Sequence, residues 1–249
     1  MNPKICVPVP VKSDNLKEIE IIIGNTLTAN PDLIEFRFDF INNTNAITSL
    51  FIKSLLNLTH SSITTIFTFR DDSEGGNAKI SKAERLKIYK LLIEAKPDYI
   101  DIEMSSDTET LSEIISLALM NKVRIIFSYH DFQRTLSYPK ALEILLRFEE
   151  RLIENNLNEF NIIDNSLFKI IFTAQDFEDN LVPIQLCKYF SKNNKNVISF
   201  CMGELGIFSR ITCVKFGSFM TYGSFEEKTA PGQIKIETIR QFHKLLFND

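Results

Sequence analysis

Lys169 lies inside an apolar run, residues 166–173, that is rich in aromatic and β-branched side chains. Such a run, bounded by polar segments, predicts a buried strand. An ammonium group is costly to remove from water, so a lysine in a buried strand needs a reason. Desolvation lowers the pKa of a lysine and makes its amine a nucleophile for carbonyl carbons. The alternative is that Lys169 snorkels from an edge strand or belongs to a helix.

His130 follows an apolar run that ends at Tyr129, and it is the histidine of this chain at the end of a predicted strand. A histidine in such a place is usually a hydrogen-bonded structural residue. Near a lysine it becomes a candidate proton shuttle, because the imidazole pKa is close to neutrality. The pair predicts imine chemistry, in which the amine condenses with a ketone and the histidine moves protons.

Charged side chains alternate in the apolar run that contains Glu35 and Arg37. Residues at i and i+2 of a strand point to the same face, so we expect these two to form an ion pair inside a closed barrel, with polar edges left for a ligand. The alternative is a surface pair on an exposed edge strand, but a closed barrel has no edge. Asp101 and Glu103 repeat the pattern further along the chain.

Two further arginines follow predicted strands. Arg70 stands before an Asp-rich loop that contains Gly75 and Gly76, and Arg210 comes after the run that ends at Met202. A planar guanidinium is suited to binding anions and hydroxyl groups, although Asp- and Gly-rich loops are also common as plain surface turns. These basic side chains suit an anionic, hydroxylated small molecule.

Short apolar runs that predict strands alternate with helical patterns along the whole chain. The eight predicted strands cover residues 5–9, 33–38, 64–69, 99–104, 123–129, 167–173, 197–202 and 214–221. Apolar residues at helical spacing predict helices over residues 81–95, 108–121, 139–155 and 234–247, with a weaker one over 203–210.

Eight strands, each followed by a helix, predict an α/β fold: a single-domain (β/α)₈ barrel, the TIM barrel, over residues 1–249. Chemistry in such barrels takes place at the C-terminal ends of the strands. The main alternative is a doubly wound open sheet, but no glycine-rich nucleotide-binding motif follows any predicted strand. No linker-like segment divides the chain.

Composition excludes several classes of protein. The formal net charge of −4 gives no indication of a nucleic-acid or membrane partner, and no apolar stretch is long enough for a membrane span. Four cysteines without a CxxC pair, together with three histidines, make a structural zinc site improbable and favour buried reduced thiols. The N-terminal residues lack a signal-peptide pattern, so we expect a cytoplasmic protein.

The residues at the predicted strand ends also resemble a family, the type I 3-dehydroquinate dehydratases. The resemblance extends over nearly the whole chain in order and spacing, and its most specific parts are the interval from His130 to Lys169, the Ser209-Arg210 pair and the turn 230–233. Further matching segments are residues 35–39, 69–70, 74–76, 101–103, 128–132 and 202–203. The resemblance implies a (β/α)₈ barrel without a cofactor that converts 3-dehydroquinate to 3-dehydroshikimate and water, in the shikimate pathway of aromatic amino-acid biosynthesis.

The resemblance also implies roles for individual residues. Lys169 would form an imine with the C3 ketone, His130 would move the protons, and Glu74 would orient His130. Arg210 would bind the substrate carboxylate. The remaining implied contacts are Glu35 and Arg70 on the ring hydroxyls with Arg37 in support, Thr229 and Gln233 on a loop that closes over the site, and Met202 and Phe132 lining the pocket.

Three positions depart from the family pattern. Asp131 stands where asparagine is more usual and adds a negative charge next to His130, Thr229 replaces serine, and Ile171 is larger than the small residue often found there, which would narrow the lumen. Two other functions remain open: a lysine-imine aldolase for a sugar phosphate, and a catalytically silent barrel that binds a metabolite. A homodimer is a family-level expectation.

Overall fold

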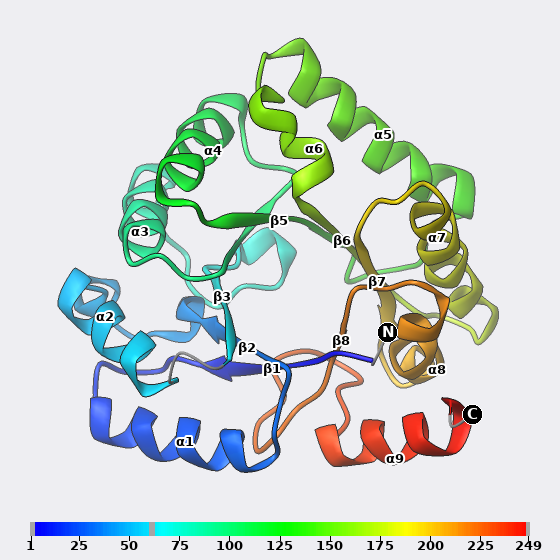
Figure 1. The fold of residues 1–249 in the computed structure, drawn as a ribbon, viewed down its shortest axis with the longest axis horizontal. Helices are drawn as coiled ribbons and strands as arrows, with labels where there is room; N and C mark the ends of the chain where they lie inside the picture. The colour runs from blue at the N-terminus through cyan, green and yellow to red at the C-terminus, as the bar shows by residue number, and fades with distance from the viewer. Residues whose placement is uncertain (1–2, 60–62, 248–249) are drawn as a thin grey trace.

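The computed structural model describes residues 3–59 and 63–247 and contains an eight-stranded parallel sheet in the order β7-β6-β5-β4-β3-β2-β1-β8. Figure 1 looks down the ring that these strands form, with the helices outside it. The strands are β1 (Ile5–Pro10), β2 (Leu33–Arg37), β3 (Thr64–Thr68), β4 (Tyr99–Glu103), β5 (Arg124–His130), β6 (Leu167–Thr173), β7 (Val197–Met202) and β8 (Thr221–Tyr222). The predicted barrel class is confirmed.

The ring is nearly closed between β7 and β8, where the sequence prediction was partly wrong. A strand was expected over 214–221, but Cys213–Phe216 forms a 3₁₀ helix that ends at Gly217 in the left-handed region, with φ 106°. The strand is therefore only Thr221–Tyr222, which pairs with β1. A bridge between Val197 and Ser218 connects this segment to β7.

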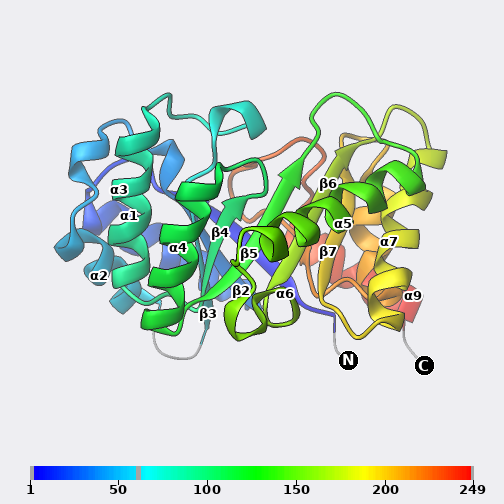
Figure 2. The same cartoon turned by 90° about the horizontal axis from the view of Figure 1, so that it is seen from above.

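Helices cover the outside of the ring, as the view from above in Figure 2 shows. They are α1 (Leu16–Thr28), α2 (Ser49–Leu58), α3 (Lys82–Glu94), α4 (Thr108–Asn121), α5 (Tyr138–Glu154), α6 (Ile162–Asn165), α7 (Leu181–Lys192), α8 (Ile207–Thr212) and α9 (Ile236–Phe247). The helix predicted over 108–121 is exact, and the weak one over 203–210 begins four residues later, at Ile207. Within the described residues, no helix combines the length and the hydrophobicity needed to cross a membrane.

The core lies between the strands and the helices, because alternate strand residues point outward. On β6, Phe168 is buried against Phe190 of α7, with ring centroids 6.3 Å apart. On β5, Phe127 packs edge-on against Phe148 of α5 at 5.0 Å. Burying each such ring contributes about 1.5–3 kcal/mol. The intervening residues, among them Lys169, face the lumen, so this core holds the reactive side chains in place.

All four cysteines are buried free thiols, as expected. Burial raises the pKa of each of them, for example to about 11 for Cys213. A thiol with a raised pKa is a poor nucleophile at neutral pH. The cysteines therefore belong to the packing of the barrel.

Candidate active site

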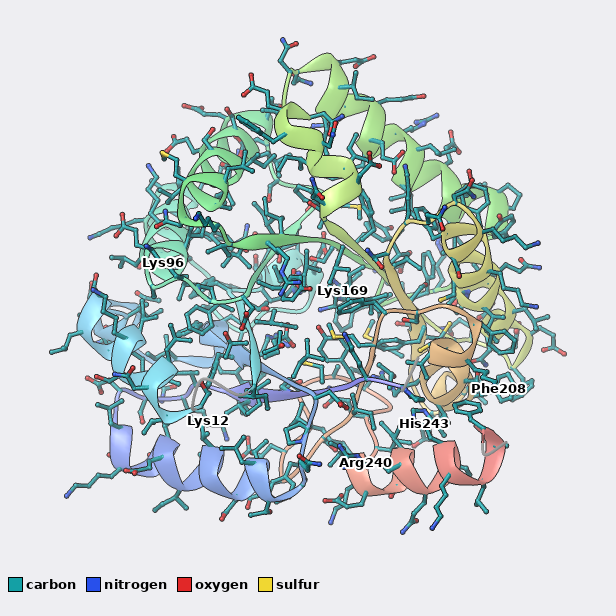
Figure 3. The ribbon with its side chains drawn as sticks, in the orientation of Figure 1. Lys12, Lys96, Lys169, Phe208, Arg240 and His243 are labelled. Atoms are coloured by element: carbon teal, nitrogen blue, oxygen red, sulfur yellow. The ribbon has the colours of Figure 1, made fainter. Side chains whose placement is uncertain are left out.

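Lys169 is 4% exposed, and Figure 3 places it at the centre of the ring. Its Nζ donates to Asp101 Oδ2 at 3.0 Å and lies 3.7 Å from Glu35 Oε1. The same nitrogen lies 4.7 Å from the centroid of the Tyr222 ring. The alternative of a snorkelling lysine is therefore wrong, because this amine points into the barrel and is surrounded by acids and an aromatic face.

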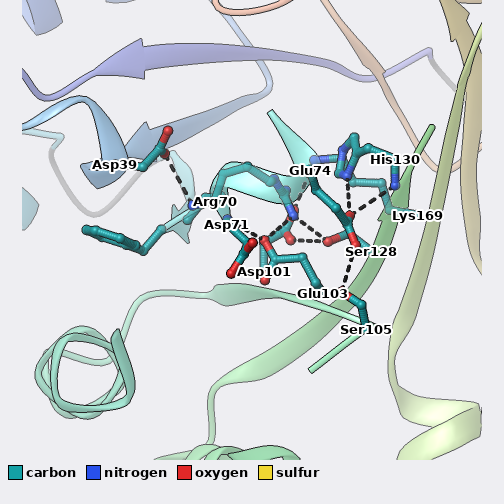
Figure 4. A network of polar contacts seen from close by, with 12 residues as sticks. Asp39, Arg70, Asp71, Glu74, Asp101, Glu103, Ser105, Ser128, His130 and Lys169 are labelled. Atoms are coloured by element: carbon teal, nitrogen blue, oxygen red, sulfur yellow. Dashed lines mark hydrogen bonds and ion pairs between the residues drawn. The ribbon is translucent and has the colours of Figure 1, made fainter. Parts of the chain in front are cut away.

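Arg70 is held by a buried network of acids, drawn in Figure 4. Its Nη2 donates to Asp101 Oδ2 at 2.8 Å, and its Nη1 donates to Glu103 Oε1 at 2.7 Å and to Ser128 Oγ at 2.6 Å. Burial alone would lower the pKa of Arg70, but Asp101 and Glu103 raise it well above its usual value. Arg70 lines the pocket, and most of its donors are already engaged by the protein.

The network extends through the barrel wall to α3. Arg85 forms an ion pair with Glu103, and the hydroxyl of Tyr89 lies 3.4 Å from the same carboxylate. Tyr89 also donates to the main-chain oxygen of Asp101 at 3.1 Å. Glu103 thus has a cation on each side of the sheet, which fixes the end of β4.

His130 and Glu74 form a pair at the edge of the pocket. His130 Nδ1 lies 3.1 Å from Glu74 Oε2, and the backbone N–H of His130 donates to the same oxygen at 3.0 Å. Burial, followed by the charges of Arg70 and Lys169, lowers the pKa of His130 well below its usual value. Burial raises the pKa of Glu74 from 4.5 to about 7. Because its pKa is lowered, the His130 imidazole is neutral at pH 7 and able to accept a proton.

Glu74 reaches His130 because two glycines shape its loop. Gly75 ends the short 3₁₀ helix Asp72–Glu74 in the left-handed region with φ 82°, and a Cβ there would lie 2.2 Å from Phe132 Cζ. A Cβ on Gly76 would lie 2.0 Å from the main-chain oxygen of Arg70. The loop needs glycine at both positions. The two glycines therefore allow the loop to place the Glu74 carboxylate next to His130, and the alternative of a plain surface turn is wrong.

Glu35 and Arg37 both face the lumen, as predicted, but the predicted ion pair between them is wrong. Arg37 donates twice to Asp39, from Nε at 2.8 Å and from Nη2 at 2.9 Å. Glu35 instead accepts from Thr68 Oγ1 at 2.6 Å and faces Lys169. The reason is that Asp39 lies just beyond the strand, within reach of a bidentate guanidinium contact.

Arg210 on α8 is 1% exposed and forms no ion pair with any described acid. Its Nη2 donates to the main-chain oxygen of Pro231 at 3.1 Å, its Nη1 lies 3.5 Å from that of Tyr222, and its Nε has no described partner. Its guanidinium lies over the Phe200 ring at 4.4 Å. Burial lowers the pKa of Arg210 to about 10, so the group remains a cation at pH 7.

The loop after β8 packs over this end of the pocket. Gln233 is 2% exposed and its Oε1 accepts from the backbone N–H of Thr229 at 2.8 Å, while its Nε2 donates to Thr229 Oγ1 at 3.2 Å. The main-chain oxygen of Pro231 accepts from Gly203 N–H at 3.4 Å. These bonds fold the loop onto the end of β7, where Arg210 lies.

One pocket brings together all the site residues predicted from sequence. Its lining includes Glu35, Arg37, Arg70, Glu74, His130, Phe132, Lys169, Met202, Arg210, Thr229 and Gln233. Phe132 is 39% exposed at the rim, whereas Met202 is buried. Over residues 3–59 and 63–247, no group of three or more His, Cys, Asp or Glu side chains is placed to hold a metal ion.

Sequence reasoning assigned no role to two residues that contact the lysine. Asp101 was noted as part of an alternating acid pattern, and only its contact with Lys169 reveals its position in the site. Tyr222 was missed because the last strand was predicted to end at Thr221. Its place directly before Gly223, at the end of the mostly apolar residues 219–222, is an available signal.

The departures from the family pattern lie in different surroundings. The Asp131 carboxylate accepts from the backbone N–H groups of Gln133 and Arg134 at 2.9 and 3.1 Å, so it caps a turn instead of contacting the His130 ring. Ile171 is 2% exposed and lines the pocket. The hydroxyl of Thr229, which serine would also supply, accepts a hydrogen bond from Gln233 Nε2.

Comparison with known proteins gives a consistent result. Residues 5–249 match the family model of Type I 3-dehydroquinase. The chain is 31% identical over 241 residues to the 3-dehydroquinate dehydratase of Methanothermobacter thermautotrophicus, covering 97% of this chain and 96% of the relative. It is 30% identical to that of Bacillus subtilis, covering 98% and 92%. The crystal structure of the Clostridium difficile type I 3-dehydroquinate dehydratase with covalently modified comenic acid superposes with a TM-score of 0.80 at 29% identity, covering 98% of this chain and 92% of that one.

Proposed function

This chain belongs to the type I 3-dehydroquinase family and is a 3-dehydroquinate dehydratase, a hydro-lyase; on that premise we propose that it works through an imine at Lys169. The proposal extends to its place in metabolism, the shikimate pathway in the cytoplasm. The relatives named 3-dehydroquinate dehydratase support the activity on which this placement depends.

The first step is condensation of the amine with the ketone. His130 takes a proton from Lys169, and the free amine attacks C3 of 3-dehydroquinate. The resulting carbinolamine loses its hydroxyl as water, with the proton returned by His130, to give a protonated imine. The positive nitrogen then acts as an electron sink for the adjacent carbon, so the C–H bond at C2 becomes acidic. The covalently modified comenic acid in the Clostridium difficile relative supports covalent chemistry in this barrel.

His130 performs the proton transfers. With Nδ1 engaged by Glu74, Nε2 of the neutral ring is the nitrogen left for the substrate. It removes the proton from C2, which leaves an enamine, and returns that proton to the C1 hydroxyl, which departs as water. Hydrolysis of the conjugated imine consumes the water lost in the first step and releases 3-dehydroshikimate, so the net reaction loses one water.

Arg210 supplies the charge that binds the substrate. An unpaired buried guanidinium is costly, and a carboxylate offers it the bidentate partner that the described protein groups do not provide. The loop that carries Thr229 and Gln233 would exclude water from the reacting atoms once substrate is bound. Barrels that act on sugar phosphates typically bind the phosphate in the loops after strands 7 and 8. Here the same loops carry Arg210 and residues 231–233, which suit a carboxylate better.

One observation carries the proposal: the buried Lys169 amine shares a pocket with a neutral histidine that is oriented by a carboxylate. The test is Lys169→Ala, which should abolish formation of the conjugated enone from 3-dehydroquinate. Substrate should still bind, measured calorimetrically, because Arg210 remains. The wild-type protein is the control, and near-normal turnover by Lys169→Ala would show that the imine mechanism is wrong.

A further inference from the structure

Asp101 is the acid closest to the reactive amine, and its carboxylate is rigidly fixed. Its Oδ1 accepts from Ser128 Oγ at 2.6 Å, and its Oδ2 accepts from Arg70 Nη2 at 2.8 Å and from Lys169 Nζ at 3.0 Å. The donors come from β5, from the end of β3 and from β6, and Asp101 itself is fully buried on β4. A carboxylate with donors from three neighbouring elements has no freedom to follow a moving ligand.

Asp101 is unsuited to act as a base. Burial would raise the pKa of its carboxyl, but Arg70 and then Lys169 lower it well below its usual value. The group therefore remains an anion throughout the working pH range and does not take the proton that Lys169 must lose before attack. A fixed anion beside the amine stabilises positive charge on the nitrogen and does not transfer protons.

Three groups around Nζ favour a positive nitrogen. Asp101 lies at 3.0 Å, Glu35 Oε1 at 3.7 Å, and the electron-rich face of Tyr222 at 4.7 Å. In a site that excludes water such preorganised groups act more strongly than they would in solution. A protonated imine carries its positive charge on this same nitrogen, so the arrangement complements the intermediate.

We propose that Asp101 is the counter-ion of the protonated imine at Lys169, a positioning residue that holds the nitrogen in place and maintains the charge on which removal of the C2 proton depends. The inference rests on the proposed imine mechanism and assigns a residue to it. Arg70, which is itself held by Glu103, shares the same carboxylate.

The charged and titratable groups around this pair come from nearly every strand. They are Cys6 on β1, Glu35 on β2, Arg70 after β3, Glu103 on β4, His130 on β5 and Tyr222 on β8. Glu103 contacts Arg70 as Asp101 does, but it forms no contact with Lys169. It therefore provides a matched control for the loss of one buried acid.

The test compares Asp101→Asn, which keeps the shape and removes the charge, with Glu103→Gln. Asp101→Asn should lower kcat by about 10²-fold, the scale for loss of one preorganised electrostatic group, and change KM by less than about 3-fold. Without the counter-ion the imine should lose its proton at a lower pH. The upper pH limit for borohydride trapping in Asp101→Asn should therefore lie about one unit or more below that of the wild type. Glu103→Gln should weaken turnover while keeping the wild-type pH limit of trapping.

The possible outcomes distinguish failure of the Asp101 proposal from failure of the imine mechanism on which it rests. Absence of a trapped adduct in the wild-type protein would overturn the imine proposal itself. A wild-type adduct together with an Asp101→Asn variant that traps over the same pH range and retains kcat within about 3-fold would overturn the role of Asp101 alone. Should the variant not fold, the structure of the borohydride-reduced wild-type adduct decides, because its secondary nitrogen should stay within hydrogen-bond distance of Asp101 Oδ2. A nitrogen displaced from Asp101 would contradict the inference.

Discussion

Two buried arginines stand at the two sides of the same pocket and have opposite surroundings. Arg70 is 3% exposed and is held by Asp101, Glu103 and Ser128. Arg210 is 1% exposed and has main-chain oxygens and an aromatic ring as its described neighbours. The acids raise the pKa of Arg70, whereas burial lowers that of Arg210 to about 10.

The difference separates structural from ligand-binding charge. A cation whose partners belong to the protein is part of the folded network, and removing it leaves buried acids uncompensated. A buried cation without an acidic partner destabilises the free protein and is stabilised when an anionic ligand arrives. The comparison therefore favours a scaffold role for Arg70 beside the lysine and supports the proposal that Arg210 binds the substrate carboxylate.

The largest expected effect is on stability when Arg70 is removed. Arg70→Met should lower the free energy of unfolding by about 3–5 kcal/mol, because Asp101 and Glu103 lose a shared cation in a buried site. Denaturant unfolding at pH 7 measures the change, with Arg210→Met as the matched control. Equal losses for both variants would erase the distinction between the two arginines.

The next effect is on substrate affinity when Arg210 is removed. Arg210→Met keeps an aliphatic side chain and removes the charge, so KM should rise by about 10²–10³-fold, the scale for truncating one partner of a buried charge pair. The free energy of unfolding should stay unchanged or increase, because an unpaired charge has been removed. Steady-state kinetics and denaturant unfolding of the same preparation measure both quantities. A KM close to the wild-type value would mean that the carboxylate binds elsewhere.

The smallest effect concerns Glu74, the carboxylate that contacts His130. Burial raises the pKa of Glu74 from 4.5 to about 7. A raised carboxyl pKa means that ionisation costs folding free energy, so stability is lost as the pH rises from about 4.5 through 7. Glu74→Gln should therefore be more stable than the wild type by about 1–3 kcal/mol at pH 8 and equally stable at pH 4. Its turnover should fall, because His130 loses the anion on Nδ1. Unfolding at the two pH values measures the effect, and equal stability differences at both would contradict it.

Much of the barrel follows from local sequence. Residues 167–173 and 197–202 are strands with the predicted bounds, because short β-branched and aromatic runs have few alternatives once they are buried on both faces. Residues 214–221 failed the same reasoning. Val214 and Phe216 look like strand residues, but Gly217 lies in the left-handed region and a Cβ there would meet Ser191 on α7, so packing ends the element.

Positions in the site were more predictable than partners. The period of two places Glu35 and Arg37 on one face of their strand, and the predicted closed barrel makes that face the lumen. The ion pairs depend on which side chains the folded elements bring within contact distance. Arg37 pairs with Asp39, and Lys169 pairs with Asp101, which is 68 residues away in the sequence. Such non-local pairing is decided by barrel geometry, which the linear pattern does not contain.

The most direct test of the central claim is the mass of the protein after treatment with 3-dehydroquinate and borohydride, followed by peptide mapping. Reduction of an imine adds a fixed mass to the amine that formed it. We expect one adduct per chain, located on Lys169 and absent from Lys169→Ala. No adduct, or an adduct on another lysine with Lys169 unmodified, would contradict it.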